Sequence, residues 1–364
     1  MTENRKRNIQ VTQTLHKKDG VIMVTIKDVA RMAKVSPSTV SRVISDSKSI
    51  SEPTKERVRA AMKELGYHPN VIARSLIRRS SQALGVVLSR SAESAFSNPF
   101  FAEILRGISK VTQRCQYSLV LATAENYKEE ARQCLQMVME RRVDGVIILA
   151  SRVNDQLIEN LSETEHPFVV VGRVDGDQHH YAVNNDNIQA AYSAVRHLLN
   201  LGHKKVAFLN GPVEYTFCQD RYQGYVMAFR EFGLTVDERY ICHAENLHAD
   251  GYKYSQQLLQ LKPQPTAIFV ADDLMVIGAY RAIKEAKLVI PDDIAVVGFN
   301  DDAFTNLLDP PLTTIRIPIY EMGKAAAETI IAVLNGDQVI PPQRILSSEL
   351  LIRDSCGAKR LVRV

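Results

Sequence analysis

The chain has 364 residues, 45% of them hydrophobic and 24% charged, which is typical of a soluble protein with more than one globular domain. No run reaches the roughly 20 apolar residues of a membrane span and no signal peptide is visible, so we expect a cytoplasmic protein and neither a membrane nor a secreted one. The five cysteines form no CxxC pair and no cluster with histidine, which predicts reduced thiols and no metal site. They are Cys115, Cys134, Cys218, Cys242 and Cys356.

The net charge of +4 is unevenly distributed. Residues 1–80 carry 17 Lys or Arg and 7 Asp or Glu, whereas the remainder carries 28 basic and 34 acidic residues. A basic N-terminal module on an acidic body is typical of a protein that contacts phosphates at one end. Within that module, residues 1–22 are polar without periodicity, and we expect a disordered or non-native N-terminal extension there.

Residues 24–44 are predicted to form two short helices joined by a tight turn at Lys34 and Val35. One apolar face of the first helix is made by Ile26, Val29, Ala30 and Ala33. Ser36 is the expected N-cap of the second helix, with Pro37 in its first turn. That helix has an apolar face of Val40, Val43 and Ile44 and a polar face of Ser38, Thr39, Ser41 and Arg42. Short hydrogen-bonding side chains and one cation on the polar face suit the DNA major groove, so we predict a helix-turn-helix. A helical hairpin without a DNA role is the alternative.

A third helix follows, with Ser51 at its start and Gly66 as its C-terminal stop. The motifs TIKDVA, VSPSTVSRV, RVRAAMKELGYHPN and ARSL, in this order, resemble the DNA-binding headpiece of the LacI family of transcriptional regulators. The resemblance implies a helix-turn-helix domain over residues 23–69. It also implies DNA contacts by Thr25, Ser36, Pro37, Ser38, Thr39, Ser41, Arg42 and Ser49.

Residues 70–81 are a linker with a short helical pattern, VIARSLIRR. An isolated helix of this length is marginal in water, so we expect it to fold only on DNA. The resemblance implies a hinge helix in the minor groove, where Leu76 wedges between base pairs and kinks the duplex. Asn70, Ala73 and Arg74 are the further contacts that it implies; a plain basic linker is the alternative.

From residue 83 onward, apolar runs alternate with helical patterns. The runs are ALGVVL, YSLVLATA, GVIILA and PFVVVG, and then KVAFLNG, AIFVAD and IAVVGFND. Strands that are apolar throughout predict parallel pairing with both faces buried, and the alternation predicts βαβ units in two doubly wound subdomains. The resemblance agrees, because it implies an α/β two-subdomain effector domain like that of periplasmic binding proteins. We expect it over residues 82–355, with an N-subdomain of about 82–183 plus 314–338 and a C-subdomain of about 184–313 plus 339–355.

Ligands of open α/β sheets bind beyond the carboxyl ends of the strands, so effector contacts are expected there. Sugars need bidentate hydrogen-bond partners and an aromatic face, which the residues after these strands provide. The resemblance implies contacts by Phe100, Arg173, Arg221, Asp272 and Asn300, and Ser89 and Asn246 are further candidates. Alternatively, Asp272 and Asn300 cap helices and Phe100 is core. The sequence departs from several relatives at Gly172, where they have an acidic residue.

The chain carries no GxSxG elbow, Walker A loop, HExxH or GxGxxG motif, so we expect neither an enzyme nor a cofactor. The segments RRVDGVI, VVVGR and DRYQGY are most similar to the maltose-operon repressors of Gram-positive bacteria. We therefore expect a repressor that releases a palindromic double-stranded operator when it binds a sugar, with maltose or a maltodextrin as the effector.

One helix-turn-helix covers one half-site, which predicts a homodimer, and the final segment SCGAKRLVRV is too short for tetramerising heptads. Three alternatives remain open. The first is a catabolite-control regulator that uses a phosphorylated carrier protein as corepressor. The second is a purine-type regulator whose ligand tightens DNA binding. The third is a sugar-binding protein without DNA regulation.

Overall fold

The computed structural model divides the chain into two compact units, Met1–Ser81 and Gln82–Val364. The division falls where the sequence analysis places the start of the effector domain. The residues that the structure describes are 17–18, 21–22, 24–67, 80–89, 91–164, 166–174, 180–245 and 247–358. The predicted hinge at 70–79 lies outside the described residues. In the N-terminal extension, β1 (Lys17–Lys18) and β2 (Val21–Ile22) pair antiparallel. The other residues of this extension lie outside the described residues.

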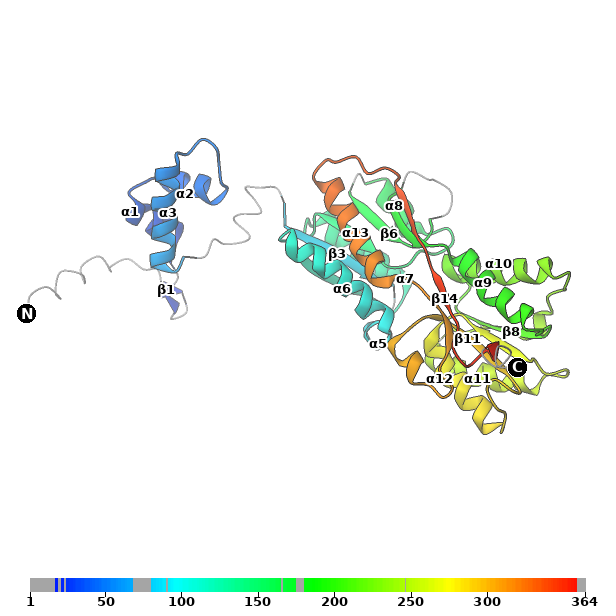
Figure 1. The fold of residues 1–364 in the computed structure, drawn as a ribbon. Helices are drawn as coiled ribbons and strands as arrows, with labels where there is room; N and C mark the ends of the chain where they lie inside the picture. Colours follow the sequence, from blue (N-terminus) through cyan, green and yellow to red (C-terminus); the bar gives the residue numbers. More distant parts are fainter. Residues whose placement is uncertain are drawn as a thin grey trace, which may run out of the picture. The chain divides into compact units, whose positions relative to one another are not determined.

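The described part of the small unit folds into three helices (Figure 1), which pack around one apolar cluster. They are α1 (Ile26–Ala33), α2 (Pro37–Ile44) and α3 (Glu52–Leu65). Val29, Val40 and Val58, one from each helix, are fully buried and form the centre of the cluster. Gly66 ends α3 in the left-handed conformation with φ of 62°, as predicted for a C-terminal glycine. This is the helix-turn-helix that the sequence predicts.

The large unit contains two six-stranded sheets, which confirms the predicted two-subdomain α/β fold. The first sheet has the order β13-β7-β6-β5-β3-β4. Its strands are β3 (Ala83–Leu88), β4 (Ser118–Thr123), β5 (Gly145–Ile148), β6 (Phe168–Val171), β7 (Ala182–Asn185) and β13 (Gln343–Leu346). The second has the order β14-β12-β11-β10-β8-β9. Its strands are β8 (Val206–Asn210), β9 (Ile241–His243), β10 (Ala267–Val270), β11 (Ala295–Asn300), β12 (Thr313–Arg316) and β14 (Glu349–Leu351). Every pair in both is parallel except β12 with β14.

Helices cover both sheets, as expected for buried parallel strands. Those of the first subdomain are α5 (Ala92–Ser97), α6 (Pro99–Arg114), α7 (Tyr127–Met139), α8 (Gln156–Ser162) and α13 (Ile319–Leu334). Those of the second are α9 (Asn187–Asn200), α10 (Thr216–Glu231), α11 (Leu247–Gln260) and α12 (Asp273–Glu285), with the short 3-10 helices η1 (Glu238–Tyr240) and η2 (Ala303–Leu307). Helices α6 and α13 lie side by side (Figure 1), and a Cβ at Gly107 would stand 2.1 Å from the Tyr320 carbonyl oxygen. Only glycine permits this approach.

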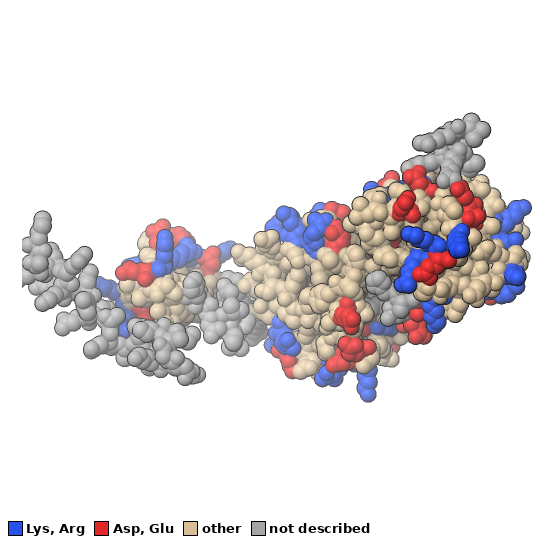
Figure 2. All heavy atoms as spheres, turned by 90° about the horizontal axis from the view of Figure 1, so that it is seen from below, with Lys and Arg blue, Asp and Glu red and all other residues tan. Residues whose placement is uncertain are grey.

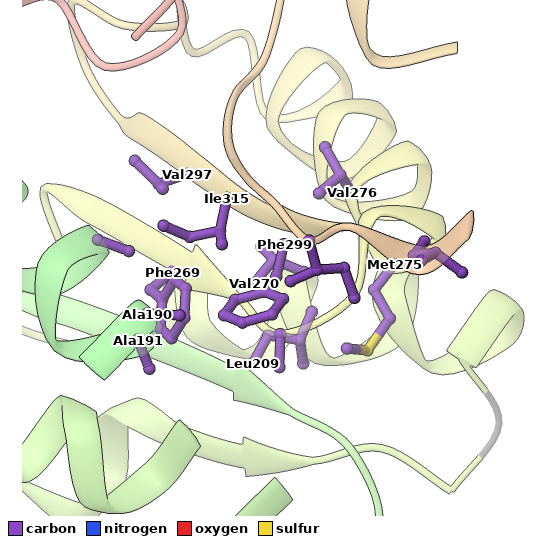
Figure 3. Packing of buried hydrophobic residues seen from close by; sticks show 14 of the residues in the cluster. Ala190, Ala191, Leu209, Phe269, Val270, Met275, Val276, Val297, Phe299 and Ile315 are labelled. Carbon is purple, nitrogen blue, oxygen red and sulfur yellow. The ribbon is translucent and has the colours of Figure 1, made fainter. Parts of the chain in front are cut away.

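The core of the second subdomain is built around aromatic side chains. Phe208 of β8 stacks on Phe269 of β10 with ring centroids 5.0 Å apart, and both are fully buried. Figure 3 shows Phe269 and Phe299 in one cluster with Ala190 of α9 and side chains of neighbouring strands and helices. This core packs the strands of the sheet against the helices behind them. The carboxyl ends of these strands carry the polar residues described below.

The chain passes between the two subdomains three times: after β7, after β12 and between β13 and β14. Two predicted boundaries are therefore corrected. Strand β12 belongs to the second sheet although residues 314–338 were expected in the first subdomain, and β13 belongs to the first sheet although residues 339–355 were expected in the second. Strand β13 is an edge strand with Arg344 and Ile345 exposed, so its burial pattern does not identify its partner.

The face of the large unit drawn in Figure 2 carries acidic and basic side chains interspersed, without a patch of one sign. The net negative charge of this part of the chain is thus spread over that face. Among the described residues, no helix is both long enough and apolar enough to cross a bilayer.

Candidate DNA-binding surface and effector cavity

The second helix of the headpiece has the cap that the sequence predicts. The Thr39 backbone N–H donates to Ser36 Oγ at 3.1 Å, and Pro37 occupies the first turn. Val40 and Val43 are buried, whereas Ser38 and Arg42 are exposed. The helix therefore presents a polar face that includes a cation.

Arg42 differs from Arg31 and Arg59, which are paired with carboxylates. Arg31 pairs with Asp28 at 3.2 Å, and Arg59 pairs with Asp46 at 3.1 Å. Within the part of the chain that the structure describes, the Arg42 guanidinium forms no ion pair. An exposed cation that no carboxylate neutralises is the group that contributes most to phosphate contact.

Other predicted DNA contacts have hydroxyl groups that are engaged within the headpiece. Thr25 Oγ1 donates to Asp28 Oδ2 at 2.6 Å, in the capping box of α1. Ser49 Oγ lies 2.9 Å from Ser47 Oγ. The predicted contacts of the hinge, namely Asn70, Ala73, Arg74 and Leu76, lie outside the described residues.

A cavity with an empty volume of about 810 Å³ lies between the two subdomains of the large unit. Residues that follow the carboxyl ends of strands from both sheets line it, which is where ligands of open α/β sheets bind. The first subdomain and the crossover after β7 contribute Ser89, Asn98, Phe100, Phe101, Leu149, Ala150, Val171, Gly172, Asn184, Asn185 and Met322. The second subdomain and the crossover after β12 contribute Asn187, Gly211, Pro212, Phe217, Cys218, Arg221, Ala271, Asp272, Asn300 and Ile317.

Five of the seven predicted effector contacts line this cavity: Ser89, Phe100, Arg221, Asp272 and Asn300. Asn246 lies outside the described residues. The lining includes Gly172 but not Arg173, and this placement differs from the prediction. Arg173 Nε instead donates to both carboxylate oxygens of Asp220 on α10, at 3.0 and 3.1 Å. Its side chain therefore joins the two subdomains.

Arg221 is the cation of the cavity, and its side chain is held on three sides. Nε donates to Asn187 Oδ1 at 3.1 Å and Nη1 donates to the Ala271 carbonyl oxygen. The guanidinium carbon lies 3.8 Å from the centroid of the Phe299 ring. The residue is only 5% exposed, and burial lowers the pKa of its guanidinium against the opposing field of carboxylates that include Asp272. Among the described residues it forms no ion pair, so a ligand oxygen would meet a fixed, buried donor.

Asp272 and Asn300 form a polar part of the wall next to Arg221, because they directly follow Ala271 and Phe299, which Arg221 contacts. Asp272 caps α12, because its Oδ1 accepts the Leu274 N–H at 2.9 Å. Its Oδ2 accepts from Asn300 Nδ2 at 3.3 Å. Asn300 Oδ1 is buried and has no partner among the described residues, which leaves an acceptor at the cavity wall. Asp272 is thus both a helix cap and a cavity residue, so the capping alternative and the effector prediction are compatible.

Asn300 owes its orientation to the carboxylate of Asp273. Asn300 has φ of 126°, which side chains rarely adopt, and the turn after it is fixed by N–H groups that converge on one carboxylate. Asp273 accepts from the N–H of Phe299 at 2.8 Å, of Asp301 at 2.8 Å and of Asp302 at 3.1 Å. Burial raises the pKa of the Asp273 carboxyl to about 7, while the Asp302 N–H opposes the rise. The strained backbone is therefore stabilised by a group outside the cavity.

Ser89 and Phe100 form the part of the wall that belongs to the first subdomain. Ser89 Oγ donates to Glu130 Oε1 at 2.7 Å, so the acceptor side of the hydroxyl is what remains for a ligand. Asn98 caps α6 by accepting the Phe100 N–H at 2.9 Å. Phe100 is partly buried and packs edge-to-face on Phe101 with centroids 5.4 Å apart. It provides the aromatic face that the sequence analysis anticipates.

Gly172 has a backbone conformation and surroundings that favour glycine at this position. Its φ is 138°, and a Cβ at this position would lie 2.9 Å from Ser151 Oγ. That hydroxyl donates to the Arg173 carbonyl oxygen at 2.5 Å. A side chain at residue 172 would strain the backbone and displace Ser151, so the cavity wall is uncharged at this position.

The sequence analysis missed several residues that line the cavity or support it. Asn187 orients Arg221, and Asn98, Asn185 and Phe217 line the wall. The run VNNDN at the end of β7 carried a usable signal, because polar residues that follow an apolar strand mark its carboxyl end. No local pattern distinguishes Asp273, the support of the turn, from Asp272, which lines the wall.

The arrangement is suited to binding rather than to catalysis. Its polar groups are one guanidinium, one carboxylate and several amides, with aromatic rings beside them, which is a set that recognises a neutral polyhydroxyl ligand. Among the described residues, no group of three or more His, Cys, Asp or Glu could hold a metal ion.

Comparison with known proteins identifies both units. Residues 25–70 match the family model of bacterial regulatory proteins of the lacI family, and residues 195–356 match that of a periplasmic binding protein-like domain. The regulator MalR of Streptococcus pneumoniae is 38% identical over 319 residues, which cover 86% of this chain and 94% of MalR.

Two solved structures resemble the whole chain. The complex of the transcriptional regulator CelR with cellobiose has a TM-score of 0.72 at 31% identity, covering 91% of this chain and 99% of that one. The lac repressor dimer bound to operator and an anti-inducer has a TM-score of 0.81 at 27% identity, covering 92% and 100%. With a helix-turn-helix headpiece ahead of a two-subdomain α/β body, this chain belongs to the LacI family of bacterial regulatory proteins and is a transcription regulator, not an enzyme.

Proposed function

We propose that the protein is a cytoplasmic repressor that binds a palindromic operator as a homodimer and releases it when a neutral sugar occupies the cavity. Maltose or a short maltodextrin is the proposed effector. The observation that carries this proposal is the meeting of Ser89, Phe100, Arg221, Asp272 and Asn300, from both subdomains, around one cavity.

The chemistry of the wall supports an uncharged ligand. Arg221 and Asp272 are its two ionisable residues of opposite charge, so neither a phosphorylated nor a strongly cationic ligand finds a complementary field. Asn300 Oδ1 and the oxygen of Ser89 accept hydroxyl protons, while Arg221 donates. Aromatic and aliphatic side chains beside these polar groups provide an apolar surface for the C–H faces of a sugar ring.

The choice of maltose rests on the sequence motifs shared with maltose-operon repressors and on the 38% sequence identity to MalR. The CelR structure holds another disaccharide, cellobiose, in a protein of the same build. The lac repressor structure is a dimer on its operator, which supports a dimer here. In that dimer each headpiece would place α2 in the major groove, with Arg42 at the phosphates and residues 70–79 as the hinge.

The proposed mechanism is a shift between two arrangements of the subdomains. The cavity wall comes from both, so a ligand that contacts both walls favours the arrangement in which they are close. That arrangement would separate the paired hinge segments and weaken operator binding. Coupling of this kind typically changes affinity by about 5- to 150-fold.

The test is fluorescence anisotropy of a labelled palindromic operator with the full-length protein. Maltose, maltotriose, cellobiose, glucose and sucrose are titrated separately. The expected result is release by maltose or maltotriose at concentrations that leave the operator bound in the presence of glucose. Arg221→Ala should bind the operator normally but fail to release it, because the variant lacks the buried donor.

Arg230→Ala is the matched control, since Arg230 lies on the same helix and is exposed. It should respond to sugar as the wild type does. Specific operator binding that no sugar alters would refute the effector assignment and favour a protein corepressor. Tighter operator binding in the presence of sugar would show that the sugar strengthens DNA binding, which is the opposite of the proposed effect. Absence of specific DNA binding would refute the repressor itself.

A further inference from the structure

The two subdomains contact each other directly beside the cavity. After β5, Arg152 forms an antiparallel backbone bridge with Tyr215, which lies just before α10 of the second subdomain. The Val153 N–H donates to the Glu214 carbonyl oxygen at 2.9 Å, and the Thr216 N–H donates to the Ser151 carbonyl oxygen at 3.1 Å. Two segments far apart in sequence are thereby joined across the subdomain boundary.

A buried ion pair lies on the first-subdomain side of this contact. Arg152 Nη2 is 2.8 Å from Glu130 Oε2 on α7, and the two side chains are 13% and 3% exposed. The guanidinium carbon also lies 4.4 Å from the ring centroid of Tyr127 and 5.0 Å from that of Tyr215. Removing one member of such a pair leaves the other charge buried and uncompensated.

The ion pair and the second subdomain both hold Ser89, which lines the cavity. Glu130 Oε1 accepts from the Ser89 hydroxyl at 2.7 Å. The Tyr215 hydroxyl donates to the Ser89 carbonyl oxygen at 2.9 Å and accepts from Arg152 Nη2 at 3.3 Å. Ser89 therefore keeps its hydrogen bond to Tyr215 only while Tyr215 stays against the first subdomain. We call Ser89, Glu130, Arg152 and Tyr215 the subdomain bridge.

The bridge retains one unsatisfied group. Arg152 Nη1 is buried and has no hydrogen-bond partner among the described residues. Its counterpart, Nη2, makes contacts to both subdomains. An ion pair that served only to stabilise the first subdomain would need no contact with Tyr215, so the geometry indicates a role in closing the cleft.

We propose that Glu130 and Arg152 are positioning residues of the effector site, which orient Ser89 and hold the second subdomain closed through Tyr215. The effector part of this proposal rests on the proposed function, whereas the closing part does not. The bridge links a cavity residue to the contact between the subdomains, so effector binding and closure share one set of hydrogen bonds.

Closure is tested first, without effector or DNA. Cys218 is fully buried and packs with Ala150 of the first subdomain and with Tyr215, so opening of the cleft exposes it. Full-length protein is treated with iodoacetamide, and alkylation of each cysteine is followed by peptide mass mapping. In Arg152→Met and in Tyr215→Phe, we expect the rate at Cys218 to rise about tenfold, within the usual range of such coupling.

Cys134 is the internal control, because it is fully buried within the first subdomain and should stay protected. Tyr215→Phe keeps the ring and removes only the hydroxyl, so it tests the bridge even if Arg152→Met folds poorly. Cys218 alkylation at the wild-type rate in Tyr215→Phe and in a folded Arg152→Met would overturn the proposal.

Effector binding is tested second, by maltose titration of the operator complex. Glu130→Gln and Arg152→Met should each weaken the response to maltose about tenfold, while operator affinity without sugar is retained or rises because the open arrangement is the one that binds the operator. The double variant should be no worse than either single one, and Arg152→Lys should restore part of the response. Arg132→Met, on the same helix with an exposed partner in Glu129, is the matched control and should change nothing.

A merely structural role would lower the folded fraction and reduce operator binding in parallel, which would overturn the positioning assignment. If the wild type responds to no sugar, the proposed effector fails, and alkylation of Cys218 still decides whether the bridge holds the cleft closed.

Discussion

The carboxyl group of Asp302 is buried. The residue is 5% exposed, and its Oδ2 has no hydrogen-bond partner among the described residues. Burial, together with the charges of Asp272 and Asp273, raises the pKa of the Asp302 carboxyl from its ordinary value of 3.8 to about 8. The folded large unit therefore binds a proton that the unfolded chain has already released at neutral pH.

The sign of the effect on stability follows from this difference. Between about pH 4 and pH 8 the native state holds one more proton at Asp302 than the unfolded state, so the free energy of unfolding falls as pH rises. One proton corresponds to about 1.4 kcal/mol per pH unit. From pH 5.5 to pH 7.5 this group alone should lower the free energy of unfolding by roughly 2–3 kcal/mol, and the dependence should end above about pH 8.

The assay is urea unfolding of the wild type and of Asp302→Asn at pH 5.5, 6.5 and 7.5. Asparagine cannot ionise, so the pH dependence of the free energy of unfolding should be smaller in the variant by close to one proton. The stability of the variant relative to the wild type should therefore increase as pH rises. Asp337→Asn removes an exposed carboxylate elsewhere and is the control for net charge. Parallel curves for the wild type and Asp302→Asn would refute the argument that burial keeps this carboxyl protonated.

Two further predictions concern the headpiece and the cavity wall. Arg42→Met should weaken operator binding and reduce the slope of log K against log salt by about 0.9 for each phosphate that is no longer neutralised, as measured by anisotropy; Arg59→Met, whose guanidinium is paired with Asp46, should leave the slope unchanged. Gly172→Ala should lower the free energy of unfolding by about 1–3 kcal/mol through strain and overlap with Ser151 Oγ. Gly336 also has a positive φ, but a Cβ there would meet no atom within 4 Å. An equal loss of unfolding free energy in Gly336→Ala and Gly172→Ala would therefore contradict the overlap argument.

Most central strands could be predicted from the sequence because they form continuous, buried apolar runs, whereas β7 and β12, with polar residues in AVNN and TTIR, were not predicted. The predicted run ALGVVL is β3 with every residue buried, and AIFVAD and IAVVGFND contain β10 and β11. The edge strand β4 was also predicted, from the run YSLVLATA, but the edge strand β13 was not, since its half-exposed residues form no continuous apolar run. Pairing of β13 with β7 joins residues far apart in sequence, and no local pattern encodes that partner.

The site was predictable where a polar residue directly follows a buried strand. Asp272 and Asn300 were found in this way, and both line the cavity. Arg173 has the same place in the pattern, but its side chain turns to Asp220. The direction of a long side chain depends on a carboxylate from another subdomain, which the order of residues along one strand does not reveal.

In the proposed mechanism, the crossovers between the sheets connect ligand contact with subdomain motion. Asn185 ends β7 and Asn187 begins α9, so the segment between two cavity residues is also the covalent link between the subdomains. Ile317 lines the cavity in the second crossover, directly after β12. A ligand at this wall therefore touches the segments whose dihedral angles must change when the subdomains rotate. Any effector that binds one arrangement better shifts the equilibrium through these contacts, without a separate path for the signal.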